Sequence, residues 1–342
     1  MERVEGREAR SGRDLAGEGQ AAPVIAVVIP SYKVAAHILG VITGIGPEVS
    51  RIYVVDDQCP DGSGQLVLDR NGDPRVTVLF NEVNRGVGGA VMAGYRQAIA
   101  DGADIIVKMD GDGQMDADLL PTLVAPIVKG QADYTKGNRF YDLSRIRDMP
   151  AVRLFGNSVL SFMAKLSTGY WGMFDPANGY TAIEARVAAH LPMDKISNRY
   201  FFETDILFRL NTLRAVVVDI PMHAKYGDET SNLKISRILF EFLAKHVRNF
   251  CKRIFYNYFL RDMSVASVEL LLGSALLAFG SVFGAVHWAR ALSENTTTPL
   301  GIIMLAAMPF LVGFQLLLAF LGYDIASAPR RPVHGDLPPR RP

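Results

Sequence analysis

Cysteine is scarce in this 342-residue chain, and neither sign of charge is in excess. The only two cysteines, Cys59 and Cys251, stand far apart and lack the spacing of metal ligands. This pattern argues against a disulfide framework and fits a reducing compartment with unpaired thiols. Lys and Arg number 36 against 35 Asp and Glu, which gives a formal net charge of +1. We therefore expect no nucleic-acid partner held by bulk electrostatics.

The first 22 residues lack the apolar core of a secretory signal peptide. Charged residues alternate there with glycine and alanine, a composition that predicts a disordered leader. The rest of the chain is long enough for one large domain with an appendage. We expect that domain to cover residues 23–234.

Short apolar runs rich in β-branched residues occur at residues 24–29, 51–56, 76–80 and 104–109. Such nearly continuous runs are typical of strands covered on both faces. Between the last two runs, apolar residues at helical spacing predict a helix that begins near Val87 and ends at Gly102. Strands that alternate with helices predict an α/β fold with a doubly wound, mainly parallel sheet.

The stretch VKMDGDGQMD, residues 107–116, follows the last run with polar side chains at alternating positions. Asp110, Asp112 and Gln114 would point the same way if the strand period continued. Their oxygens are hard ligands that suit Mg²⁺ or Mn²⁺. The alternative is an ordinary Gly/Asp-rich turn. In doubly wound sheets ligands bind beyond the carboxyl ends of the strands, where further polar residues stand: Ser31, Tyr32, Asp56, Asp57 and Asn84.

Two long segments without clusters of charge dominate the C-terminal third. Residues 264–289 contain only Glu269 and His287 as charged or titratable groups, and residues 299–323 contain no charged residue. A helix needs about 20 apolar residues to cross the ~30 Å hydrocarbon core, so both segments are long enough to span a membrane. We assign a transmembrane hairpin to residues 263–323. The alternative is a hairpin buried in a soluble protein.

Basic residues flank this hairpin, whereas the link between its two segments holds only Arg290. Positive charge favours the cytoplasmic side of a membrane. We therefore expect an integral protein of the cell (plasma) membrane, with both termini, the domain and a tail at residues 324–342 in the cytoplasm. The flanking basic residues are Lys245, Arg248, Lys252, Arg253 and Arg261 before the hairpin and Arg330, Arg331, Arg340 and Arg341 after it.

Residues 235–262 form a separate unit just before the hairpin. Their apolar residues keep near-helical spacing, with basic residues largely between them: Ile235, Ile238, Leu239, Phe242, Phe250, Ile254 and Tyr258. A basic amphipathic helix beside a membrane span is typical of a segment that lies in the membrane interface. The alternative is a helix that only docks on the soluble domain.

Four strings, in this order along the chain, resemble motifs of glycosyltransferase family 2. They are VVIPSYKV at 27–34, VDDQCPDGS at 55–63, NRGVGGA at 84–90 and DGDGQ at 110–114. The resemblance covers about residues 24–235 and implies the GT-A fold. Such a domain followed by two spans is similar to the polyprenyl-phosphate glycosyltransferases, a group that includes dolichol-phosphate-mannose synthase relatives. The Q-x-x-R-W string of processive polysaccharide synthases is absent, which argues against chain elongation.

The resemblance also implies roles for individual residues. Asp57 would lie beside the nucleotide base and Asp110 beside the ribose and diphosphate, within a nucleotide-binding set of Pro30, Tyr32, Asp56, Asp57, Asn84, Gly88 and Asp110. The metal, Mg²⁺ or Mn²⁺, would be held by Asp110, Asp112 and Gln114. The candidate catalytic residues are Asp112, Arg139, Arg153, Glu203 and Asp205.

Among these candidates, Arg139 and Arg153 match basic residues that receive the acceptor phosphate, and Glu203 and Asp205 match an acidic motif on a helix. The alternative is that the two arginines are ordinary surface residues and that the acidic pair is structural. The sequence leaves open whether His223 contacts a ligand or has a structural role.

The predicted function is inverting transfer of a single sugar from a nucleotide-diphosphate sugar, expected to be UDP-linked, to polyprenyl phosphate at the cytoplasmic membrane face. One alternative is a nucleotidyltransferase of similar fold, although its Gly-rich, basic loop is missing after the first strand. The other is a non-catalytic membrane scaffold with a degenerate transferase domain. The expected partners are the donor, the lipid and the membrane, with no nucleic acid; a homo-oligomer stays open.

Overall fold

The computed structural model describes residues 22–141, 151–176, 178–222 and 235–338, so the expected leader lies almost wholly outside the described residues. Seven strands form one sheet within this part: β1 (Ile25–Ser31), β2 (Arg51–Asp56), β3 (Val76–Phe80), β4 (Ile105–Lys108), β5 (Tyr134–Asn138), β6 (Thr181–Glu184) and β7 (Val217–Pro221). The domain's helices are α1 (Ile38–Gly44), α2 (Ser63–Arg70), α3 (Val87–Ala100), α4 (Leu120–Val128), α6 (Ala151–Thr168), α7 (Ala185–Ala189) and α8 (Phe202–Leu213).

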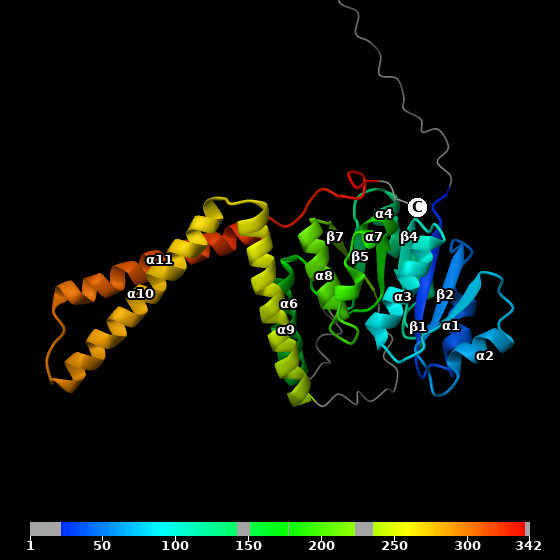
Figure 1. Ribbon diagram of the computed structural model, residues 1–342, viewed down its shortest axis with the longest axis horizontal. Helices are drawn as coiled ribbons and strands as arrows, with labels where there is room; N and C mark the ends of the chain where they lie inside the picture. The colour runs from blue at the N-terminus through cyan, green and yellow to red at the C-terminus, as the bar shows by residue number, and fades with distance from the viewer. Residues whose placement is uncertain (1–21, 142–150, 177, 223–234, 339–342) are drawn as a thin grey trace, which may run out of the picture.

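Three long helices follow the domain (Figure 1): α9 (Ile235–Phe255), α10 (Val265–Ser293) and α11 (Leu300–Ala326). A π-helical turn, Tyr256–Arg261, continues α9 toward α10. Short 3-10 turns cover Ala117–Leu119 and Met193–Lys195.

The strand order is β3-β2-β1-β4-β6-β5-β7. Strand β6 runs antiparallel to β4 and to β5, and the other neighbouring pairs are parallel. The prediction of a mainly parallel, doubly wound sheet is confirmed. Because β4 and β5 both run opposite to β6, they run the same way as each other. The carboxyl ends of all these strands except β6 therefore meet at one edge of the sheet.

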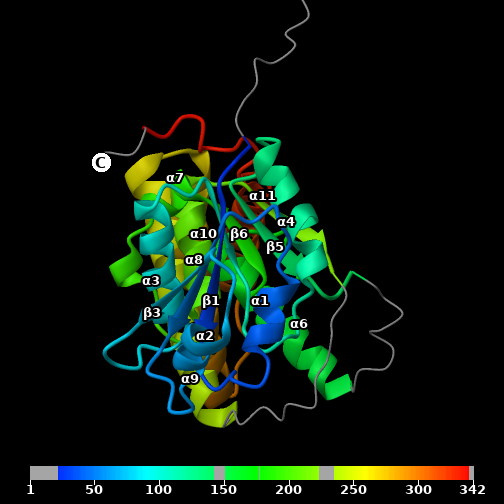
Figure 2. The ribbon, with the colours of Figure 1, turned by 90° about the vertical axis from the view of Figure 1, so that its right-hand side faces the viewer.

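Side chains of β1 alternate between two hydrophobic layers. Ala26 and Val28 pack with residues of α3, α7 and α8, whereas Ile25, Val27 and Ile29 pack with residues of α1, α2 and α4. Figure 2 shows the sheet between these two groups of helices. Successive side chains of a strand point to opposite faces, so a strand covered on both sides needs an apolar residue at each position.

The structure confirms the predicted strands at residues 24–29, 51–56, 76–80 and 104–109, each within two residues of its ends. The predicted helix is also confirmed, as α3. Gly102 has a φ of +84°, a backbone conformation that glycine adopts readily, and it follows the end of that helix as expected.

Helix α9 packs against α6 and α8 through polar as well as apolar side chains. His246 and Asn249 are buried; His246 Nδ1 lies 2.8 Å from Ser167 Oγ, and Asn249 Nδ2 donates to Asp205 Oδ1 at 3.0 Å. Another face leaves apolar side chains exposed at helical spacing: Phe240, Leu243, Val247 and Phe255. Helix α9 is thus docked on the domain, and Ile254 and Tyr258 of the predicted apolar face are buried rather than exposed. The exposed apolar stripe lies on other residues, and the position of α9 in the membrane interface stays a prediction.

Helices α10 and α11 pack side by side as a hairpin (Figure 1) and are long and apolar enough to cross a membrane. Glycines allow their backbones to approach closely. A Cβ on Gly280 would lie 2.6 Å from Ala306 O, and a Cβ on Gly313 would lie 2.5 Å from Leu277 N. In the most apolar stretch of each helix, only 22% and 6% of the residues are buried. This exposure argues against a hairpin buried in a soluble core.

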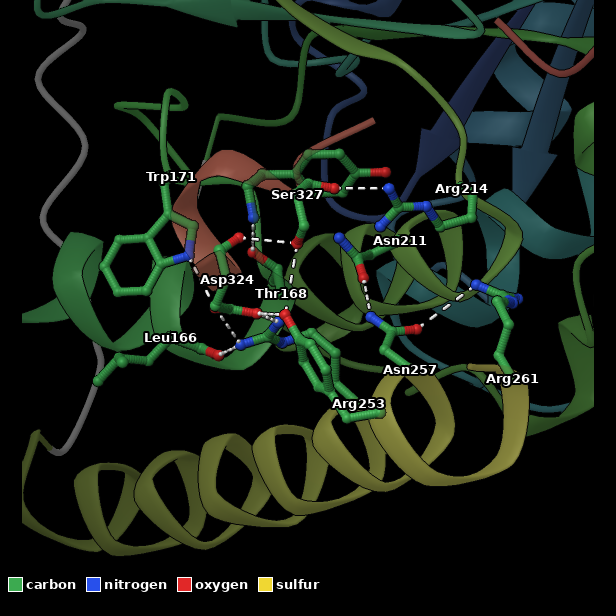
Figure 3. A network of polar contacts seen from close by, with 12 residues as sticks. Leu166, Thr168, Trp171, Asn211, Arg214, Arg253, Asn257, Arg261, Asp324 and Ser327 are labelled. Carbon is green, nitrogen blue, oxygen red and sulfur yellow. Dashed lines mark hydrogen bonds and ion pairs between the residues drawn. The ribbon is translucent and has the colours of Figure 1, made fainter. Parts of the chain in front are cut away.

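A buried ion pair joins the end of the hairpin to α9 and the domain (Figure 3). Arg253 Nη1 lies 2.6 Å from Asp324 Oδ1, and both side chains are almost fully buried. Tyr258 Oη and Trp171 Nε1 donate to the same carboxylate at 2.6 and 3.0 Å, and Arg253 Nη2 donates to Leu166 O at 2.8 Å. Three segments far apart in the sequence therefore meet at Asp324.

The chain after α11 returns to the domain and packs against it (Figure 1). Asp133, which is fully buried, accepts hydrogen bonds from the backbone N of Val333 and of His334 and lies 2.7 Å from His334 Nδ1. Val333 and Leu337 pack against the core layer that contains α3. The domain and the tail consequently lie at the same end of the hairpin.

Candidate active site

The carboxyl edge of the sheet brings the predicted motifs together. In the sheet register Ser31 at the end of β1 is opposite Asp56 at the end of β2, and Asp56 is opposite Phe80 at the end of β3. Asp110 follows β4 and Arg139 follows β5 at the same edge. The segment that leads into β6 also meets this edge, because β6 runs the other way.

Asp110 to Gln114 form a turn directly after β4. Gly113 has a φ of +78°, which favours glycine, and the backbone N of Gln114 donates to Asp112 Oδ1 at 2.9 Å. Asp110, Asp112 and Gln114 are all partly exposed. Two carboxylates and an amide oxygen in one partly open turn fit Mg²⁺ or Mn²⁺. The described residues contain no group of three His, Cys, Asp or Glu side chains suited to a metal, so Gln114 or the substrate would complete the ligand set.

A buried group of charged residues lies beneath this turn. Lys108, whose side chain is 3% exposed, places its Nζ 2.7 Å from Asp110 Oδ1 and 4.0 Å from Glu203 Oε1. Lys136, on β5, is fully buried and its Nζ donates to Asn178 O. Glu203 stands in the first turn of α8 and reaches this group from the neighbouring helix.

Burial shifts the pKa values of two residues in this charged group. It raises the pKa of Glu203 to about 7, although Lys108 and Lys136 favour the carboxylate. Burial likewise lowers the pKa of Lys136 to about 8. The candidate active site therefore contains a carboxyl group that titrates near neutral pH, close to the lysine that pairs with Asp110.

Gly179 lies against this charged group, where a side chain would have to displace the paired ends of Lys108 and Asp110. A Cβ there would collide with Lys108 Nζ and lie 2.9 Å from Asp110 Oδ2. Asn178 fixes the same stretch, since its Oδ1 accepts from the backbone N of Tyr180 at 2.9 Å. Gly179 thus brings its backbone close to Asp110, the carboxylate that the resemblance places beside the ribose and diphosphate.

Asp56 and Asp57 are buried and hold the loops around the predicted nucleotide site. Asp56 accepts hydrogen bonds from the backbone N of Cys59 and of Gly64, both at 2.7 Å. Asp57 accepts from Asn81 Nδ2 at 2.8 Å and from Gly86 N at 2.7 Å. Both carboxylates therefore shape the backbone here, and the contact of Asp57 with a base stays a prediction.

Of the other residues predicted for the nucleotide site, Tyr32 is exposed, whereas Pro30, Asn84 and Gly88 contact other parts of the domain. Tyr32 is 45% exposed at the carboxyl edge, whereas Pro30 is buried within β1. Asn84 donates to Asp57 O at 3.1 Å. Gly88 stands where a Cβ would collide with Ser197 O and lie 2.7 Å from Phe202 Cβ, so it permits a close approach of α3 to the loop before α8 and to the first residue of α8.

Arg139 forms a two-pronged ion pair with Asp175. Its Nε and Nη2 donate to the two carboxylate oxygens at 2.8 and 3.1 Å. Asp175 is 2% exposed and Arg139 is 35% exposed, so the guanidinium reaches the surface while its partner does not. The side chain of Arg153 and all of His223 lie outside the described residues.

Asp205 does not reach the turn that carries Asp110. Its side chain is fully buried and accepts hydrogen bonds from the backbone N of Ser197 at 2.9 Å and from Asn249 at 3.0 Å. These contacts tie α8 to α9 and to the loop before α8. Of the predicted acidic pair, the structure brings only Glu203 to the charged group under the turn.

Sequence reasoning did not identify Lys108 and Lys136 as part of this site. Lys108 ends an apolar run in β4, and Lys136 lies within the buried strand β5, whose sequence YTKGN shows no apolar run. A buried lysine is rarely found without a partner, so a lysine within such a run is itself a signal. The partners could not be inferred from spacing, because Glu203 and Asn178 are far away in sequence.

Comparison with known proteins agrees with this geometry. Residues 26–191 match the model of the family described as glycosyl transferase family 2. The undecaprenyl-phosphate mannosyltransferase of Micrococcus luteus is 30% identical over 203 residues, which cover 58% of this chain and 82% of that protein. A UDP-N-acetylglucosamine–dolichyl-phosphate N-acetylglucosaminyltransferase of Methanococcus voltae is 26% identical, over 60% of this chain and 87% of that protein.

A solved structure supports the fold. Glucosyl-3-phosphoglycerate synthase of Mycobacterium tuberculosis, in complex with Mn²⁺, UDP-glucose and phosphoglyceric acid, superposes with a TM-score of 0.50. It is 19% identical, and the match covers 68% of this chain and 79% of that one. The family assignment decides against the nucleotidyltransferase and scaffold alternatives. The chain belongs to glycosyl transferase family 2 and is a glycosyltransferase with a GT-A fold.

Proposed function

We propose that this glycosyltransferase moves a single sugar from a nucleotide-diphosphate sugar to polyprenyl phosphate at the cytoplasmic face of the cell membrane. One observation carries the proposal. The same chain holds the DGDGQ turn at the carboxyl edge of a GT-A sheet and two helices that are able to span a membrane. The names of the relatives from Micrococcus luteus and Methanococcus voltae support a polyprenyl-type phosphate acceptor.

On the donor side, Asp110, Asp112 and Gln114 would hold Mg²⁺ or Mn²⁺. When bound, the ion would neutralise the charge that develops on the departing nucleoside diphosphate. Lys108 holds Asp110 through a 2.7 Å ion pair, which would keep the carboxylate oriented before the donor arrives. Tyr32 presents an exposed aromatic ring at the same edge, where a nucleobase could pack on it.

On the acceptor side, the nucleophile would be a phosphate oxygen that attacks the anomeric carbon with inversion. A phosphate monoester has a second pKa of about 6, so near pH 7 it is largely dianionic and needs no general base. Arg139 and Arg153 would hold this dianion, since a guanidinium offers two parallel hydrogen bonds to a phosphate. Asp175 fixes the orientation of Arg139 for that purpose.

The donor is tested by a binding panel. We expect a UDP-linked sugar, in the presence of Mn²⁺, to raise the melting temperature of the full-length protein more than the corresponding GDP-linked sugar does. Stabilisation by the GDP-linked sugar alone would refute the UDP assignment and leave the transferase function in place. Stabilisation by neither, with or without Mn²⁺, would count against the proposed donor class.

The proposed topology places the domain and both termini in the cytoplasm. The return of the tail to Asp133 supports one side for both, and the basic residues support the cytoplasmic side. In a Cys59→Ser, Cys251→Ser background, cysteines introduced at Ser293 and at Arg330 should react with an impermeant thiol reagent from opposite sides of the membrane. Labelling of both from one side would overturn the topology.

A further inference from the structure

A polar cavity lies away from the carboxyl edge, between α8, α9 and the π-helical turn. Its volume is about 640 Å³, and it is lined by Pro192, Lys195, Phe208, Arg209, Thr212, Arg248, Lys252, Tyr256, Leu260 and Arg261. We call it the basic cavity. Thr212 stands nine residues along α8 from Glu203, about 13 Å at the helical rise, so the basic cavity is distinct from the candidate active site.

The charge of the basic cavity has one sign. Among the lining residues that the structure describes, five are basic and none is acidic. Lys195, Arg248, Lys252 and Arg261 are exposed, and within the described residues Arg248 and Lys252 form no ion pair. Arg209 is the exception in part, since its Nη2 lies 3.8 Å from Asp205 Oδ2. Cations gathered in one place repel each other, and each of them would attract an anion bound among them.

The protonation of the lining residues agrees with this excess of positive charge. Burial lowers the pKa of Arg209, and the nearby Arg248 lowers it further. Burial also lowers the pKa of Arg261, together with the nearby Arg214. In both cases a neighbouring cation acts in the same direction as burial. An anion in the basic cavity would relieve this repulsion.

The basic cavity lies beside the membrane-spanning hairpin. Arg261 precedes Val265, the first residue of α10, by four positions. Large apolar side chains around it are exposed: Phe255, Leu260, Met263 and Val265. Basic residues next to exposed apolar ones are typical of a surface at the level of lipid headgroups. An anion that reaches the basic cavity from the membrane would come with acyl chains that these apolar residues can contact.

We propose that the basic cavity binds the headgroup phosphate of an anionic membrane phospholipid and so fixes α8 and α9 against the bilayer. Zwitterionic lipids carry a cation in the headgroup that five basic residues would repel, so selectivity for a net negative lipid follows. The inference rests on the proposed membrane placement of α10 and α11 and not on the transfer of sugar. It gives the enzyme a second lipid contact, separate from the acceptor.

The test measures thermal unfolding of the full-length protein in a neutral detergent. Dioctanoyl phosphatidylglycerol should raise the melting temperature clearly more than dioctanoyl phosphatidylcholine, and inorganic phosphate at the same concentration should have little effect. The double variant Arg248→Gln, Lys252→Gln should bind the anionic lipid about tenfold more weakly. The matched control is Arg330→Gln, Arg331→Gln, which removes the same charge beside the hairpin but outside the basic cavity.

Three results would overturn the inference: equal effects of the two lipids, equal loss in the control variant, or the full effect from inorganic phosphate alone. If the double variant fails to fold, Lys252→Gln alone carries the test, because the described residues give that side chain no polar partner. Donor binding, measured separately on the same samples, should be unchanged. If the wild-type protein does not bind the donor, that result would count against the transferase proposal and leave the lipid result unaffected.

Discussion

At the scale of single residues, Lys108 is the buried cation beside Asp110 in the proposed donor site. It is almost fully buried, and it contacts Asp110 on one side and approaches Glu203 on the other. Replacing one member of a buried charged group leaves the others without compensation, at a cost of about 3–5 kcal/mol. We expect Lys108→Gln to lower kcat/KM for the donor by about 100-fold and to lower the melting temperature.

A steady-state assay with varied donor concentration checks this expectation, with the exposed Lys129→Gln as control. An unchanged kcat/KM in a folded Lys108→Gln variant would show that Asp110 needs no such support.

We expect Glu203 to make the stability of the protein depend on pH. Its pKa of about 7 in the folded protein lies above the ordinary value of 4.5. Between these values the folded state keeps a proton that the unfolded state has lost, so the contribution of Glu203 to stability falls as pH rises from about 4.5 to 7. Melting temperatures across this range should fall less steeply for Glu203→Gln than for wild type. Parallel curves would mean that folding does not raise the pKa of Glu203.

At the scale of secondary-structure elements, Asp324 connects α11 to α9 and to the loop after α6. The same loop continues from Trp171, which donates to Asp324, to Asp175, which holds Arg139. The end of the hairpin is therefore linked to the proposed phosphate-binding arginine through Trp171 and Asp175, which stand four positions apart in the chain. Such a link would align the acceptor site with the membrane surface.

We expect Asp324→Ala to destabilise the protein by about 3–5 kcal/mol, because Arg253 would remain buried without its partner. Trp171→Phe removes only one hydrogen bond to that carboxylate, at about 1 kcal/mol, and should raise the KM for the lipid acceptor without changing that for the donor. Thermal unfolding and two-substrate kinetics measure these effects. Breaking the exposed pair Arg331–Asp336 with Asp336→Ala should change neither. Equal effects from that control would refute the role of Asp324.

The elements differ in how far the sequence predicts them. Strands β1 to β4 follow from continuous apolar runs, whereas β5 reads YTKGN and β6 reads TAIE. Lys136 lies in a strand that has no apolar run, and the groups that stabilise its buried charge, Glu203, Asp175, Asp219 and Asn178, come from other parts of the chain. The antiparallel direction of β6 also depends on contacts distant in sequence, so no local pattern specifies it.

The same limit applies to the candidate site. The motifs place Asp110, Asp112 and Gln114 correctly at the end of β4, because strand ends are local features. The resemblance does not separate Glu203, which approaches Lys108, from Asp205, which ties α8 to α9. The two stand on one helix two residues apart and so point in different directions.

At the scale of the whole molecule, the hairpin and the tail contribute to the stability of the domain through their contacts with it. Removal of all residues after Arg261 would leave Arg253 without Asp324 and Asp133 without Val333 and His334. We expect such a truncated protein to melt well below the full-length one. Adding Arg253→Met and Asp133→Asn to the truncated protein should restore part of the difference, because an apolar or neutral group costs less to bury than an unpaired charge. No recovery would argue against these contacts as the cause.

The central claim is sugar transfer to a polyprenyl phosphate by the metal-holding turn after β4, in a protein placed in a membrane. The most direct measurement follows a radiolabelled sugar from its nucleotide donor to polyprenyl phosphate in vesicles that contain the full-length protein and Mn²⁺. We predict one labelled sugar per lipid phosphate, loss of most transfer in Asp112→Asn, and no transfer by wild type in EDTA. Full transfer in EDTA, or no labelled lipid from any donor that the protein binds, would contradict the claim.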